Sequence, residues 1–263
     1  MNKYKKLAMN TGVFAIGSFG SKILVILLTR LYSTHIDPDS TAIKELLEPT
    51  ALFLQPIFTF ALQEYLIRFG LDKEYDKREV FTTSGAITLA GMLLMALVVP
   101  ILSLIPAMSY LRGYVILLTV YVTTSSIRML CQQFVRSRDM VKLFSLDGIL
   151  ATLTLFLFNL LFIAGFHWGV TGFMLAVILS DLLSSVFLFI VADLGRFAHP
   201  KYFNAELGRE MMKFAAPMIP TIVMWTITSL SDRLFIENMK SDRVQLGKVP
   251  VTLYSYANRI PNL

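Results

Sequence analysis

Four cationic side chains stand inside or beside long apolar stretches of this sequence: Lys22, Arg30, Arg128 and Arg233. An ionised group near the centre of a bilayer costs at least ~2.5–3.5 kcal/mol on insertion scales, so it faces an interior, a cavity or a partner. Arginine offers a planar fork of donors that fits phosphate oxygens. We therefore expect a cation-lined cavity that binds an anionic group. For Arg30, Arg68 and Arg233, near the ends of their stretches, the alternative is that the side chain reaches to the membrane interface.

Neutral polar residues accompany these cations at helical spacing. One face of the stretch around Arg128 carries a stripe of polar side chains, which recur every three or four residues: Tyr121, Thr124, Ser125, Arg128 and Gln132. Gln55 and Gln63, eight residues apart, line a second stretch in the same way. The pattern predicts a polar lumen between helices.

Two acidic residues also fall inside apolar stretches. Asp181 is followed by Ser184 and Ser185, and it either carries a proton or ion, or only forms a hydrogen bond with a neighbouring serine. Asp232 stands next to Arg233, which favours a local electrostatic contact within one helix over a role in ion coupling. Both are candidate ion-coupling residues.

The sequence offers little for catalysis. It has no GxxxxGK[ST] phosphate loop and no HExxH pattern, and its three histidines, His35, His167 and His199, are far apart. The single cysteine, Cys131, lies in an apolar stretch and can form no disulfide within the chain. We expect neither an enzyme nor a metal or cofactor site.

The elements that must hold these residues are membrane helices. Apolar residues make up 55% of the chain and charged residues 16%, and the mean hydropathy is +0.63, which is typical of a polytopic all-α membrane protein. A span needs roughly 20 apolar residues. Seven stretches qualify and an eighth begins near residue 251: 9–32, 47–69, 80–105, 110–135, 146–166, 170–192 and 215–236.

Charge in the loops predicts the orientation. Basic residues gather at the N-terminus and in alternate loops: Lys3, Lys5, Lys6, Arg68, Lys73, Lys77, Arg78, Arg136, Arg138, Lys142, Arg196, Lys201, Arg209 and Lys213. By the positive-inside rule these segments, the N-terminus included, face the cytoplasm, and residues 33–45 form a turn outside. The seventh loop, with three basic residues, weakens the alternation. The net charge of +6 then reflects topology, and nucleic acid is not an expected partner.

The long basic connection at residues 193–214 predicts a division of the chain. A six-helix bundle covers residues 1–192, the connection is a cytoplasmic linker, and residues 215–263 begin a second bundle. The last segment, Tyr254-Ser-Tyr-Ala-Asn-Arg-Ile-Pro261, enters a helix and the sequence stops inside it. We expect the chain to be the first part of a two-bundle protein.

Four segments carry a resemblance to a known family. They are Asn10–Leu24 with Leu31-Tyr32, Ala61–Phe69, Pro217–Pro220 with Leu230–Ile236, and Tyr254–Pro261. In order and spacing they resemble the oligosaccharide (O-antigen-type) flippases of the multidrug/oligosaccharidyl-lipid/polysaccharide exporter superfamily. Arg30 departs from that family's pattern, where the position after Thr29 is often apolar or proline.

This resemblance implies a transporter that works by alternating access and is driven by an ion gradient or the membrane potential. Its cargo would be a polyprenyl diphosphate-linked oligosaccharide, moved from the cytoplasmic to the outer leaflet of a bacterial inner membrane for surface polysaccharide biosynthesis. Lys22, Arg30, Arg128 and Arg233 would contact the diphosphate. Membrane lipids and other polysaccharide-assembly membrane proteins are further expected partners.

Two other functions stay open at this point. A drug or metabolite exporter of the same superfamily would need a cavity balanced towards acidic residues, for which Asp181 and Asp232 are candidates. A membrane-embedded glycan polymerase or glycosyltransferase would need a large outer loop with catalytic groups, and no such loop is evident in the sequence.

Overall fold

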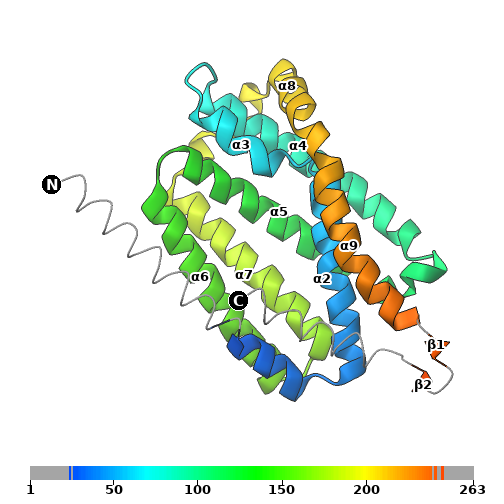
Figure 1. The fold of residues 1–263 in the computed structure, drawn as a ribbon. Helices are drawn as coiled ribbons and strands as arrows, with labels where there is room; N and C mark the ends of the chain where they lie inside the picture. Colours follow the sequence, from blue (N-terminus) through cyan, green and yellow to red (C-terminus); the bar gives the residue numbers. More distant parts are fainter. Residues whose placement is uncertain (1–23, 25, 239, 242–243, 246–263) are drawn as a thin grey trace, which may run out of the picture.

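The computed structural model is a bundle of α-helices (Figure 1). It describes residues 24, 26–238, 240–241 and 244–245, and residues 26–35 form the end of a helix. The remaining elements in chain order are α2 (Pro38–Phe58), α3 (Leu62–Leu71), α4 (Lys77–Leu102), η1 (Pro106–Leu111), α5 (Val115–Ser137), α6 (Val141–Asn159), the π-helical turn η2 (Leu160–Gly165), α7 (Gly169–Val191), η3 (Leu194–Arg196), η4 (Pro200–Tyr202), α8 (Ala205–Ala215), η5 (Ala216–Met218), α9 (Ile219–Asn238), and an antiparallel pair of two-residue strands, β1 (Lys240–Ser241) and β2 (Val244–Gln245).

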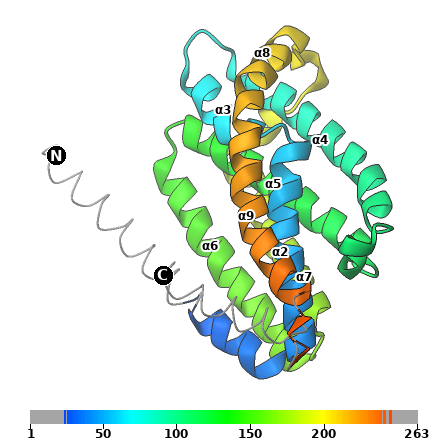
Figure 2. The same ribbon diagram turned by 45° about the vertical axis from the view of Figure 1, so that its right-hand side comes forward.

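Four helices of the described residues are long and apolar enough to span a bilayer. They are α4, α5, the continuous unit of α6 and η2, and α7. Helices α5, α6 and α7 lie side by side, and α9 packs along α2 (Figures 1 and 2). The sequence-based expectation of an all-α polytopic membrane protein is confirmed.

The second predicted span is interrupted. Helix α2 ends at Phe58 and α3 begins at Leu62, and between them Phe60 and Ala61 adopt left-handed φ angles of 53° and 51°. Ala61 N–H donates to the carbonyl of Pro56 at 2.8 Å, which closes the end of α2 as a helix C-terminal turn does. The prediction of one continuous helix over 47–69 was wrong, because neither Phe60 nor Ala61 is a residue type that marks such a turn.

The turn predicted at residues 33–45 is present but much shorter, at residues 36–37. The residues after it are helical, because Asp37 acts as N-cap and Pro38 occupies the first helical position. The Asp37 carboxylate accepts a hydrogen bond from Ser40 N–H at 2.8 Å, which lowers the pKa of Asp37. Lys44, read as a loop residue, is consequently buried inside the bundle.

The basic loops meet at one end of the bundle, which we call the basic end. Arg78 donates to the Tyr202 hydroxyl at 3.0 Å, and Arg138 donates to the carbonyl of Ala192 at 2.7 Å. The linker predicted at 193–214 contains η3, η4 and the amphipathic helix α8, which buries Leu207 and Met211 against α3 and α4. The alternate basic loops therefore share one side, as the charge pattern requires.

Two apolar clusters fill the bundle, one towards each end. The basic-end cluster includes Leu62, Leu66, Val80, Phe81, Leu130, Phe134, Leu143, Leu188 and Met211. The far-end cluster includes Leu47, Leu54, Met95, Val99, Leu118, Val122, Ile163 and Met174. Buried polar side chains lie between the two along each helix, and we call them the polar layer: Thr59, Gln63, Thr88, Ser126, Asp147, Ser180, Asp181 and Ser184. The break between α2 and α3 also lies between the two apolar clusters, because Phe58 belongs to the far-end cluster and Leu62 to the basic-end cluster.

Candidate functional site

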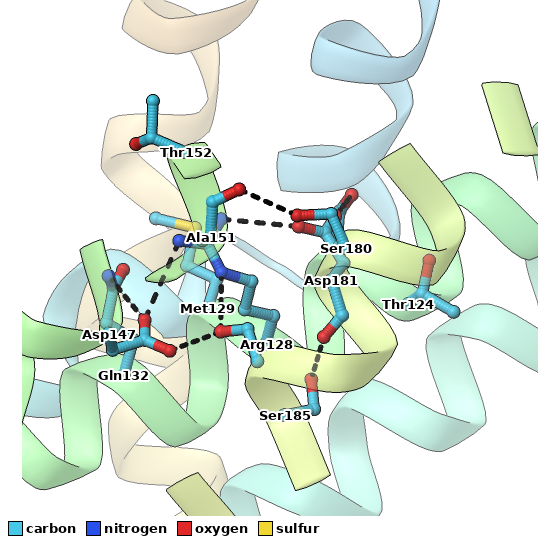
Figure 3. A network of polar contacts seen from close by, with 12 residues as sticks. Thr124, Arg128, Met129, Gln132, Asp147, Ala151, Thr152, Ser180, Asp181 and Ser185 are labelled. Carbon is cyan, nitrogen blue, oxygen red and sulfur yellow. Dashed lines mark hydrogen bonds and ion pairs between the residues drawn. The ribbon is translucent and has the colours of Figure 1, made fainter. Parts of the chain in front are cut away.

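Arg128 joins three helices within the polar layer (Figure 3). From α5, its Nη1 lies 3.3 Å from Asp181 Oδ1 on α7, and its Nη2 lies 3.6 Å from Asp147 Oδ2 on α6. Its Nε donates to Ser184 Oγ at 2.9 Å. These contacts use all three guanidinium nitrogens, so the side chain is held as a fork between two carboxylates.

The two aspartates are buried and carry further hydrogen bonds. Asp147 is fully buried and accepts from Ser184 and, at 3.1 Å, from Gln132. Asp181, 6% exposed, accepts from Ser125. The Arg128 side chain retains 25% exposure. With both carboxylates ionised, the cluster Arg128–Asp147–Asp181 has a net charge of −1, and the Arg128 side chain is its most exposed member.

Two glutamines connect the helix break to α5. Gln55 of α2 donates to Gln63 of α3 at 3.1 Å, and Gln63 donates to the backbone carbonyl of Ser126 at 2.7 Å. The side-chain amide of Gln55 also donates to the sulfur of Met129, at a distance of 3.6 Å. The break is therefore cross-linked by neutral hydrogen bonds to the same turn of α5 that carries Arg128. Broken helices are tolerated at membrane depth only where protein or a cavity surrounds them.

The sequence matches the model of a polysaccharide biosynthesis protein family over residues 7–263. The chain belongs to this family. Neither a curated protein nor a solved structure matches the chain. The family together with the helical membrane fold places the chain among polysaccharide-related membrane transporters.

For this family member, the structure brings together most of the predicted polar stripe. Ser125, Arg128 and Gln132 all reach Asp147 or Asp181 on the neighbouring helices. Thr124 instead donates to the carbonyls of Val120 and Tyr121 in its own helix. Gln55 and Gln63 meet each other, as their shared stripe suggested.

Among the other predicted cations, the described structure places Arg30 and Arg68 outside this cluster. Lys22 lies outside the described residues, and Arg233 belongs to α9 but its side chain is not described. Arg30 is exposed near the end of its helix. Asp232 is exposed on α9. Arg68, expected near an interface, stacks over the Phe214 ring with its guanidinium carbon 3.8 Å from the centroid.

Sequence reasoning missed Asp147. The fifth span was predicted to start at Leu146, which put Asp147 at a helix end, where a carboxylate is ordinary. Helix α6 starts at Val141, so Asp147 lies in its second turn, about 9 Å along the axis. Two features of the sequence could have found it: the helix-compatible run from Val141, and the absence of any acidic residue in the 115–137 stretch to balance Arg128.

A second ionic cluster was missed as well. The Lys44 ammonium, fully buried, lies 3.1 Å from Glu45 and 3.0 Å from Glu48. The same nitrogen stands 4.3 Å from the centre of the Phe173 ring and 4.7 Å from that of Tyr32. This cluster joins the start of α2 to α7 at the far end of the bundle, away from Arg128.

Proposed function

We propose that the chain belongs to a transporter that flips a polyprenyl diphosphate-linked oligosaccharide from the cytoplasmic to the outer leaflet of the cell membrane, by alternating access. The family supports a polysaccharide-related cargo. The observation that carries the finer proposal is a part-exposed arginine fork in the polar layer of a membrane bundle, because this group can bind diphosphate oxygens. In this proposal the basic end faces the cytoplasm, and Lys22, Arg30 and Arg233 are further candidate contacts of the diphosphate.

Transport of the labelled cargo between leaflets tests this proposal. The full-length protein is reconstituted in liposomes, and the transfer of a fluorescent polyprenyl diphosphate-linked oligosaccharide is followed with a membrane-impermeant quencher. We expect Arg128→Gln to slow transfer by roughly 10-fold or more, because a charge-assisted hydrogen bond contributes about 1.5–3 kcal/mol. Arg136→Gln is the matched control, since Arg136 is an exposed arginine near the end of the same helix.

The variant Arg128→Lys separates two ways of binding. Retained transfer means that a point charge suffices, whereas loss of transfer means that the planar fork of two donors is needed. A wild-type protein that transfers no labelled lipid contradicts the proposed cargo.

A second candidate function follows from the charge of the same cluster. One arginine against two buried aspartates leaves a net negative site, which suits a cationic drug or metabolite. In the same liposomes, export of a cationic dye without any lipid transfer would favour this exporter over the flippase.

A further inference from the structure

The two carboxylates of the Arg128 cluster differ in how their oxygens are occupied. Asp147 Oδ2 receives the Gln132 amide and faces the guanidinium, and its Oδ1 receives the Ser184 hydroxyl, which itself accepts from Arg128 Nε. Asp147 Oδ2 thus faces two donors. A proton at Oδ1 would require the Ser184 hydroxyl to accept from Asp147 as well as from Arg128 Nε, and to lose Asp147 as the acceptor of its own hydrogen.

Asp181 offers a place for a proton. Its Oδ1 faces Arg128 Nη1, but its Oδ2 faces only the hydroxyl of Ser125 among the contacts of its side chain. A hydroxyl can donate or accept. If Asp181 is protonated at Oδ2, Ser125 reverses its role and accepts the new hydrogen bond, and no donor–donor clash results.

We infer that Asp181 is a proton-binding site that switches Arg128 between its carboxylate partners and an anionic cargo. The inference rests on the proposed function for the identity of that cargo. A proton from water adds to the Asp181 carboxylate, and the ion pair with Nη1 of Arg128 is lost. The cluster then changes from a net charge of −1 to neutral, and Arg128 keeps Asp147 while Nη1 becomes available to a phosphate oxygen.

A proton fits this site better than a metal cation. The guanidinium occupies the space between the two carboxylates, so a metal ion bound to both would have to displace it or lie against its positive charge. Among the described residues, no group of three or more His, Cys, Asp or Glu side chains is arranged to hold a metal ion.

Other titratable groups lie near the cluster on α5 and α2. On α5 these are Tyr121, close to Asp181, and Cys131, close to Asp147. Glu48 of α2 lies near Tyr121 and is the further carboxylate on that side. Glu48 shares Lys44 with Glu45, and its side chain is 37% exposed, whereas the Asp181 side chain is 8% exposed beside Arg128.

A measurement without cargo tests the proton site. Infrared difference spectra of the full-length protein in lipid are recorded between mildly alkaline and acidic pH. We expect the C=O band of a buried carboxylic acid at acidic pH in the wild type, absent in Asp181→Asn and retained in Asp147→Asn. Asp193→Asn, at an exposed position two residues beyond the end of α7, is the matched control and keeps the band. A band that persists in Asp181→Asn, or none in the wild type, overturns the inference.

A second variant covers the case in which Asp181→Asn does not fold. Ser125→Ala retains both aspartates but removes the hydroxyl that would accept the proton's hydrogen bond. We expect the band to shift in frequency in this variant, because the acid group loses its acceptor. An unshifted band means that the proton binds elsewhere.

Binding of farnesyl diphosphate, a short polyprenyl diphosphate, tests the link to Arg128. In the wild type its affinity should rise as the pH falls, by at most about 10-fold per pH unit for one proton beyond the probe's own ionisation. In Asp181→Asn only the probe's ionisation remains, so the slope is smaller. Equal slopes overturn the switch. A carboxylic acid band with no binding at any pH supports the proton site and overturns the diphosphate cargo, so the two failures are distinguishable.

Discussion

The side-chain amide of Gln63 donates to the backbone carbonyl of Ser126 at 2.7 Å, next to the point where α2 and α3 are interrupted. Gln63 also accepts from Gln55 on the other side of the interruption. One side chain thus ties both halves of the broken helix to α5, two residues before Arg128. The position of the candidate site therefore depends on a neutral hydrogen-bonded bridge.

Replacing Gln63 tests this bridge. Gln63→Leu should lower the free energy of unfolding by roughly 1–3 kcal/mol, because the variant removes one buried and one part-buried hydrogen bond and leaves the Gln55 amide without this partner. Gln133→Leu is the matched control on α5. The Gln133 Oε1 is buried without a hydrogen-bond partner in the described structure, so its removal should cost less. Unfolding in detergent monitored by circular dichroism compares the two, and equal losses would contradict the bridge.

The interrupted helix also packs very tightly against α4. A Cβ added to Gly91 would stand 1.6 Å from the carbonyl oxygen of Phe58, the last residue of α2. Gly91→Ala should therefore lower the free energy of unfolding by about 3 kcal/mol, the upper end of the usual cost of overpacking, because the added Cβ meets backbone that cannot easily move. Gly148→Ala on α6 is the control, because a Cβ there meets nothing within 4 Å. Thermal unfolding of the two variants decides the point, and similar midpoints would refute the close approach.

Lys44 is the buried cation at the far end of the bundle. Lys44→Met should destabilise the fold by about 3–5 kcal/mol, because the variant removes the cation that lies beside Glu45 and Glu48. The same substitution at the exposed Lys77 should change stability by no more than about 0.5 kcal/mol. Chemical unfolding in detergent provides the comparison. If the two variants were equally stable, Lys44 would not hold the start of α2.

Two tyrosines outside the spans should titrate in opposite directions. The hydrogen bond from Tyr75 to Glu210, at 2.6 Å, raises the pKa of Tyr75, whereas Lys201 and then Arg78 lower the pKa of Tyr202. Tyr75 thus stabilises the fold below its ordinary pKa, and this contribution is lost as the pH rises through the raised pKa. For Tyr202 the contribution is present above the ordinary pKa and is lost as the pH falls through the lowered one.

Tyrosinate absorbance measures both directions. The difference between wild type and Tyr202→Phe should titrate at lower pH than the difference between wild type and Tyr75→Phe. The reverse order would show that these loop contacts do not persist in solution.

Some of this structure could be predicted because the signal is local. Long apolar runs predict α4, α5, α6 and α7, and the three-and-four spacing around Arg128 predicts the face that meets its neighbours. The first and last residues of each helix were harder to predict, since hydropathy is averaged over many residues. The charged pair Lys44-Glu45 is typical of a loop by composition, yet both residues belong to α2, because that helix already begins at the N-cap Asp37.

The features that were missed depend on tertiary structure. The turn at Phe60 and Ala61 has no glycine to mark it, and it forms because the Gln55–Gln63 bridge and the close contact with Gly91 hold it in place. Asp147 is meaningful only once α6 lies beside α5 and α7. Sequence periodicity shows which residues share a face, but it does not show which faces meet.

The depth of Asp181 links the candidate site to the membrane's electric field. Asp181 lies near the middle of α7, so a proton that reaches it from the far end of the bundle crosses about half of the hydrocarbon core. Moving one elementary charge across the whole membrane potential releases or costs about 2.3 kcal/mol per 100 mV, so half of that distance corresponds to roughly 1 kcal/mol. If Asp181 binds a proton as inferred above, a change of 100 mV at constant pH on both sides would shift the ratio of protonated to ionised Asp181 by roughly 5-fold, so the membrane potential as well as the pH would set the charge of the Arg128 cluster.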